Sequence, residues 1–163
     1  MTLLLAGAAF VAEGVIFLAE GSPDEAGATQ NAVALVATVA LAAAIAGFLR
    51  LYRAGRSGEV GAIVAVTGLA VQGFALVAAL AGGGDVFRDT IFAIGFLVMA
   101  LGLITYGIAV IRANTLPRWW ALAFFLPLVL LVVPGDYGVI VFGSLWLALG
   151  GLVLAARPHL DRA

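Results

Sequence analysis

Six long apolar runs, separated by short polar stretches, account for most of the chain. Each run approaches the roughly 20 residues that an α-helix needs to cross the hydrocarbon core of a bilayer. The runs lack the period-two alternation of membrane β-strands and carry Ala, Leu, Val and Gly on every face. The pattern therefore predicts an all-α integral membrane bundle of six transmembrane helices, at residues 3–19, 32–49, 60–81, 91–111, 119–133 and 139–156.

The polar stretches between the runs are short and rich in residues that end helices. Examples are Gly82-Gly83-Gly84 and Pro134-Gly135-Asp136. The stretches are too short to hold a soluble domain, so we expect residues 1–163 to form one domain. The first run has the position of a signal peptide, but it lacks a preceding basic segment and contains Glu13. We therefore interpret it as a membrane helix.

Charged residues segregate between the two sides of this predicted bundle. One side has seven arginines and two acidic residues, and the other has six acidic residues and one arginine. An even number of crossings places both termini on the arginine-rich side, which the positive-inside rule makes cytoplasmic. The arginine-rich side comprises Arg50, Arg53, Arg56, Arg112, Arg118, Arg157 and Arg162 with Glu59 and Asp161, and the acidic side comprises Glu20, Asp24, Glu25, Asp85, Asp89 and Asp136 with Arg88.

Composition supports a bilayer location and excludes several classes of function. Hydrophobic residues make up 64% and charged residues 10% of the chain, too little charge to cover a soluble fold. The basic residues are scattered arginines, so we expect no nucleic-acid partner. The absence of cysteine and lysine and the single histidine, His159, exclude thiol chemistry, a retinal Schiff base and a bis-histidine haem within one chain. We expect neither a cofactor nor a metal site.

Small residues indicate where the helices approach one another. Lipid tails are as apolar as leucine, so membrane helices associate through close van der Waals contact, which small residues permit. The second run is the best candidate for the centre of the bundle, because Ala34, Thr38, Ala42 and Ala46 recur every four residues. Further candidate contact points are Gly61 and Ala65 in the third run and Gly143 with Gly151 in the sixth.

Four polar residues are predicted to lie near the middle of the bilayer. Counting about 1.5 Å per residue from the helix ends places Glu13, Gln72, Thr38 and Ser144 at this depth. A carboxylate at the centre of a membrane helix costs at least about 2.5–3.5 kcal/mol and is expected to face protein or water. No arginine lies within an apolar run, so burial favours the neutral acid of Glu13. We expect Gln72 to be its hydrogen-bond partner.

Three interpretations of Glu13 remain open on sequence grounds. The carboxyl group is a structural clasp between the first and third helices, a site for a proton or cation, or a catalytic acid. A second polar layer, closer to the cytoplasm, is predicted at Thr67, Thr105 and Tyr106. Tyr106 and Trp146 serve either packing or the lining of a cavity.

The segment from Gly107 to Trp119, in which an apolar helix ends at Arg112 and is followed by Leu116-Pro117-Arg118, carries a family resemblance. It resembles small, uncharacterised polytopic membrane proteins of actinobacteria over the fourth to sixth runs. The resemblance implies a bacterial cytoplasmic membrane and no assigned reaction, and it transfers no functional residue to this chain.

These observations favour a non-enzymatic accessory, regulatory or assembly subunit, because the polar stretches are too short to build a site on the water side. Its expected partners are membrane lipids and a second copy of the chain or a larger membrane complex. The alternatives are a small proton- or cation-linked transporter or channel with a site at Glu13 and Gln72, and an intramembrane enzyme or binder acting on a lipid or isoprenoid.

Overall fold

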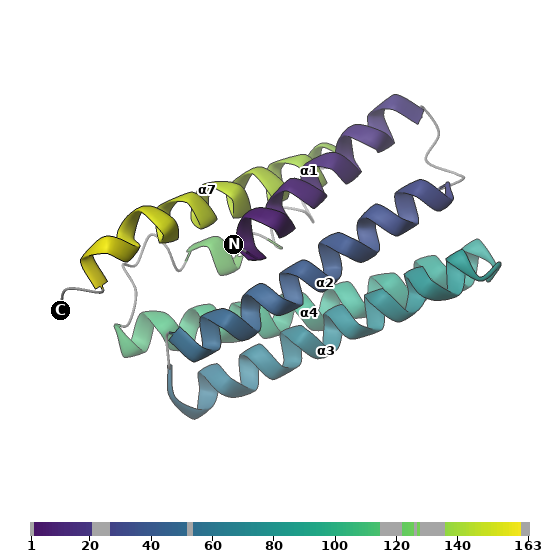
Figure 1. Ribbon diagram of the computed structural model, residues 1–163. Coiled ribbons are helices and arrows are strands. Elements are labelled where there is room, and N and C mark those ends of the chain that lie inside the picture. The colour runs from purple at the N-terminus through teal and green to yellow at the C-terminus, as the bar shows by residue number, and fades with distance from the viewer. Residues whose placement is uncertain are drawn as a thin grey trace.

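The computed structural model describes residues 2–20, 27–51, 54–114, 122–125, 127 and 136–160. Within these ranges the chain is almost entirely helical and contains no strand, which confirms the predicted all-α class. The elements are α1 (Thr2–Glu20), α2 (Ala28–Leu51), α3 (Gly55–Leu80), α4 (Asp85–Ala113), a short 3₁₀ helix η1 (Leu122–Phe125) and α7 (Asp136–Leu160) (Figure 1).

Three of these helices are long and apolar enough to cross a membrane: Ala28–Arg50, Gly55–Leu80 and Val86–Ala113. α1 and α7 contain shorter apolar helical stretches, Leu3–Ala19 and Tyr137–Leu152. The structure therefore supports a membrane-embedded protein.

The helices extend beyond the apolar runs, which corrects several predicted boundaries. α3 begins at Gly55, so the segment from Gly55 to Gly58 forms the first turn of a helix and not a connection. α4 begins at Asp85, well before the predicted start at residue 91. The physical reason is that a polar side chain does not interrupt backbone hydrogen bonding, so a helix continues past the last apolar residue into the headgroup region.

Residues in left-handed conformation mark two helix ends. Gly82, with φ of 88°, follows the last turn of α3, and the N–H of Gly83 donates to the carbonyl oxygen of Ala78 at 2.8 Å. This confirms the turn predicted at Gly82 to Gly84. Asn114, with φ of 51°, caps α4, and its N–H donates to the carbonyl oxygen of Ile111. Asparagine tolerates this conformation better than most residues with a Cβ atom.

The predicted fifth helix, at residues 119–133, lies mostly outside the described residues. Within it, Leu122–Phe125 forms a 3₁₀ turn and not the expected α-helix. η1 contacts both α4 and α7.

The bundle consists of two closely packed helix pairs joined by α2. α3 packs against α4, and α1 packs against α7, although α1 and α7 lie at opposite ends of the chain. α2 contacts both α1 and α3, and Figure 1 shows it between the two pairs. The predicted central position of this helix agrees with that arrangement.

Glycines bring α3 and α4 into backbone contact. Gly61 and Gly68 on α3 face Gly102 and Gly95 on α4, so the two helices are antiparallel. A Cβ atom added at Gly61 would lie 2.6 Å from the backbone nitrogen of Tyr106, and one added at Gly68 would lie 2.6 Å from the carbonyl oxygen of Gly95. Such distances are too short for carbon, so only glycine fits at these positions.

α1 and α7 meet through an equivalent contact. A Cβ atom added at Gly7 would lie 2.7 Å from the carbonyl oxygen of Gly143, and one added at Gly143 would lie 2.7 Å from the backbone nitrogen of Val11. Gly150, seven residues beyond Gly143, faces Leu4 on the same interface. The predicted contact point Gly151 is wrong, because this residue is exposed and nothing lies within 4 Å of a Cβ atom added to it.

The buried face of α2 differs from the predicted small-residue stripe. Ala34 and Thr38 are buried, Ala42 is half-buried and Ala46 is exposed. An α-helix has 3.6 residues per turn, so positions four apart advance by 400° and Ala46 lies about 120° around the helix from Ala34. The observed buried line alternates steps of three and four residues and passes through Ala34, Ala37, Leu41, Ala44 and Phe48.

Candidate functional site

Glu13 lies in α1 and is buried in the bundle, with 7% of its surface exposed. Its Oε2 atom has no hydrogen-bond partner among the described residues. α1 is a continuous helix at this point and packs against α7 and α2, so its buried face carries the carboxyl group into the protein. Burial was predicted for this residue, and the structure agrees.

Gln72 is also buried, on α3, but its side chain does not reach Glu13. The Nε2 atom of Gln72 donates to the Sδ atom of Met99 on α4 at 3.6 Å. α3 packs against α4 and α2, whereas α1 packs against α7 and α2. The expected hydrogen bond between Gln72 and Glu13 is therefore replaced by a contact that joins α3 to α4.

The two other predicted midplane residues differ from each other in exposure. Thr38 is buried on α2, and its hydroxyl donates to the carbonyl oxygen of Ala34 at 2.8 Å. Ser144 is exposed on α7. Since the hydroxyl proton of Thr38 is used within its own helix, Thr38 offers an incoming group only its acceptor capacity.

The predicted second polar layer does not form inside the bundle. Thr67 and Thr105 are exposed, and their hydroxyls donate to the carbonyl oxygens of Ile63 at 2.9 Å and Leu101 at 2.8 Å. Tyr106 is fully buried and packs edge-to-face on Phe124. An exposed threonine in a membrane helix commonly donates its hydroxyl proton in this way, because the carbonyl oxygen four residues earlier is the nearest acceptor.

Replacement of either exposed threonine by valine tests this assignment. Thr67→Val and Thr105→Val are each expected to change the free energy of unfolding by less than about 0.5 kcal/mol, since valine keeps the shape and the lost bond lies within one turn. Unfolding in mixed detergent–SDS micelles measures the effect. A loss of 2 kcal/mol or more (about the size of a broken internal network) would show that these hydroxyls bind another helix.

An aromatic cluster fills the space between the helix pairs. Phe124 of η1 lies edge-to-face against Phe48 of α2, Tyr106 of α4 and Trp146 of α7, with ring centroids 5.0–6.2 Å apart. The ring of Trp146 also packs edge-to-face against Phe142, and Phe142 packs in the same way against Phe10 of α1. Tyr106 and Trp146 thus both pack against other rings of this cluster, which is one of the two roles predicted for them. Phe124 was missed because nothing in an apolar run distinguishes a central phenylalanine from a lipid-facing one.

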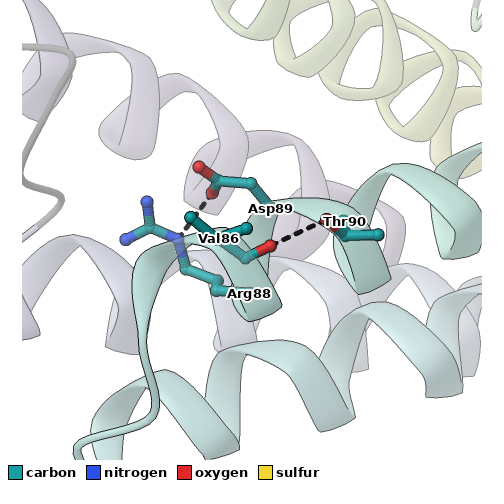
Figure 2. A network of polar contacts seen from close by, with 4 residues as sticks. All are labelled: Val86, Arg88, Asp89 and Thr90. Carbon is teal, nitrogen blue, oxygen red and sulfur yellow. Dashed lines mark hydrogen bonds and ion pairs between the residues drawn. The ribbon is translucent and has the colours of Figure 1, made fainter.

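Arg88, for which the sequence predicts only a place among the charges of the acidic side, is a buried polar residue. It lies in the first turns of α4, and its Nε atom donates to Oδ1 of Asp89 at 2.8 Å. Figure 2 shows this ion pair at the start of α4. The side chain of Arg88 is 9% exposed, against 65% for Asp89. The available signal was that Arg88 is the one arginine on the acidic side.

Gln30 and Asn31, in the first turn of α2, are two further buried polar residues that were missed. The Nε2 atom of Gln30 has no hydrogen-bond partner among the described residues. Both residues precede the apolar run predicted for this helix, so hydropathy gave no indication of their burial.

Within the described ranges, histidine, aspartate and glutamate side chains form no group of three or more that could hold a metal ion. Comparison with known proteins found no matching family model, no similar curated protein and no similar solved structure.

Proposed function

We propose that the chain is a six-crossing protein of a bacterial cytoplasmic membrane with both termini on the cytoplasmic side. The directions of the helices support this topology. Antiparallel glycine contacts orient α4 against α3 and α7 against α1, and Figure 1 shows α4 and α7 running the same way. Two helices with the same direction require an odd number of crossings between them, as a fifth membrane segment provides.

The distribution of charge supports the proposed orientation. Arg50 lies in the last turn of α2, Arg56 in the first turn of α3 and Arg112 in the last turn of α4, all at one end of the bundle. Asp89 lies in the first turns of α4, at the other end. The positive-inside rule assigns the arginine-bearing end to the cytoplasm.

Within this topology the protein acts as a non-enzymatic accessory, regulatory or assembly subunit. The observation that carries this role is the dispersion of the polar side chains. Gln72 bonds to Met99, Thr38 to its own helix, and Ser144 is exposed, so these groups do not converge on one point. Catalysis requires several groups held together around a reacting atom. The expected partners are membrane lipids, a second copy or a larger membrane complex.

One observation favours a second candidate, a proton or cation site at Glu13. A buried carboxyl oxygen without a partner is costly, and ionisable residues inside membrane segments commonly mark ion pathways. The alternative of a lipid or isoprenoid enzyme needs a second polar group in hydrogen-bond reach of Glu13. Its expected partner, Gln72, is bonded elsewhere.

Flux measurements in proteoliposomes separate the two candidates. For a subunit that acts through partners, the purified protein alone is expected to give no proton, Na⁺ or K⁺ flux above that of protein-free vesicles. Flux that scales with protein and is lost in Glu13→Gln, but retained in Glu59→Gln, would replace the first candidate by the second. Glu59 is the matched control, because it is exposed on α3.

Photocrosslinking in the native membrane tests the accessory role directly. A photoreactive residue at Phe74 of α3 or Val39 of α2, exposed by 61% and 60%, faces the surroundings of the bundle. A subunit that assembles with a partner is expected to give a discrete protein adduct from one such face. Lipid adducts alone from every exposed face, including Val141 on α7, would count against assembly.

A further inference from the structure

A groove opens between the end of α2 and the beginning of α3. It has a volume of about 340 Å³ and is lined by Leu49 and Arg50 from α2 and by Glu59 and Ile63 from α3. Among the residues that the structure describes, the groove is thus bordered by one cation, one anion and two apolar side chains.

The two charges in the groove are available to a ligand. Arg50 and Glu59 are both exposed, and no ion pair or hydrogen bond joins them to each other in the described part of the chain. Two opposite charges that border one groove without neutralising each other are complementary to a molecule that itself carries both signs.

The order of the lining residues matches the depth profile of a lipid. Arg50 is the penultimate residue of α2, and Glu59 lies in the second turn of α3, so both charges lie near the end of the bundle. Ile63 follows Glu59 by four residues, which places it on the same face about 6 Å further along the helix axis. On the α3 side, the groove therefore changes from charged at Glu59 to apolar at Ile63, further from the end of the bundle.

We propose that this groove binds an amine-bearing zwitterionic phospholipid of the phosphatidylethanolamine class. The guanidinium of Arg50 binds the phosphate, a pairing that arginine makes with charge-assisted hydrogen bonds. The carboxylate of Glu59 accepts hydrogen bonds from the primary ammonium group, and Leu49 and Ile63 contact the start of the acyl chains. The proposal requires the membrane placement of α2 and α3 and is independent of the role of Glu13.

The same chemistry predicts selectivity among headgroups. A phosphatidylglycerol headgroup satisfies Arg50 but offers no cation to Glu59. A choline headgroup carries the cation without an N–H group, so it cannot donate to the carboxylate. Binding is therefore expected to be strongest for the ethanolamine lipid and weaker for the other two.

Native mass spectrometry of the full chain in detergent, titrated with lipids of identical acyl chains, tests the proposal. The wild type is expected to retain more phosphatidylethanolamine than phosphatidylglycerol or phosphatidylcholine. Glu59→Gln is expected to lower the preference for ethanolamine over glycerol about three-fold, the size of an exposed charge interaction. Arg50→Gln is expected to lower the binding of both lipids by a similar factor.

Arg56→Gln is the matched control, because it removes an exposed arginine at the same end of the bundle from outside the groove lining. It should leave the headgroup preference within two-fold of the wild type. The proposal is overturned if Glu59→Gln keeps the wild-type preference, or if Arg56→Gln weakens lipid binding as much as Arg50→Gln does, since attraction would then depend on net charge alone.

Discussion

Gly68→Ala is expected to lower the free energy of unfolding by about 2–3 kcal/mol. The added Cβ atom would lie 2.6 Å from the carbonyl oxygen of Gly95 and also against the backbone of Met99. Backbone atoms cannot rotate away as a flexible side chain can, so α3 and α4 would have to move apart along their whole interface. Unfolding of the purified protein in mixed dodecyl maltoside–SDS micelles, followed by circular dichroism, measures this loss.

Gly73→Ala is the matched control for this prediction. Gly73 lies on the same helix, but a Cβ atom added there would meet only Cδ1 of Leu35 at 3.6 Å, an ordinary contact. Because alanine favours the helix over glycine, this variant is expected to be as stable as the wild type or more stable, by up to about 1 kcal/mol. Equal stability of the two variants would show that α3 and α4 do not meet at Gly68.

The helices themselves were predictable because each depends on a local property. A long apolar run favours a helix, as found at α1, α2, α3, α4 and α7. In the fifth run, the described residues Leu122–Phe125 form a 3₁₀ turn instead. The predicted boundaries were less accurate. α3 begins at Gly55 and α4 at Asp85, whereas the apolar pattern predicts starts at residues 60 and 91. Hydropathy reports the depth of a residue, whereas helix ends depend on backbone hydrogen bonding.

The pairing of helices was not predictable, because it depends on contacts between distant parts of the chain. α1 packs against α7 through Gly7 and Gly143, which are separated by most of the sequence. Among glycines of an alanine-rich chain, the sequence cannot distinguish Gly150, which contacts Leu4, from the neighbouring Gly151, which is exposed. One residue changes the direction of a side chain by 100° around the helix.

In the candidate site, too, the sequence predicts the position of a residue along its helix but not the side of the helix on which its side chain lies. Glu13, Gln72 and Thr38, which the apolar runs predict to lie near the middle of the bilayer, are buried in the bundle. The hydrogen-bond partner predicted for Gln72 was Glu13, but its side chain donates to Met99 on α4 instead. Ser144 and Thr67 lie within helices but face outward, because depth along a helix does not determine rotation about its axis.

Phe124, at the centre of the aromatic cluster, is the site of the second large expected loss of stability. Its ring joins η1 to α2, α4 and α7. Phe124→Ala is expected to lower the free energy of unfolding by about 3 kcal/mol. Phe124 is fully buried, and its ring contacts Phe48, Tyr106 and Trp146 from three different helices. Its removal leaves a cavity, and the close backbone contacts within each glycine-packed pair oppose the helix movements that would fill it. The same mixed-micelle unfolding, followed by tryptophan fluorescence, measures the loss.

Phe74→Ala deletes the same atoms from α3 and is its matched control. Phe74 is 61% exposed and contacts Phe87 by a single ring edge, with centroids 6.4 Å apart. Surrounding lipid or detergent fills the space that this ring vacates, so no cavity remains and the expected loss is below about 1 kcal/mol. A loss at Phe124 no larger than that at Phe74 would mean that η1 does not hold the two helix pairs together.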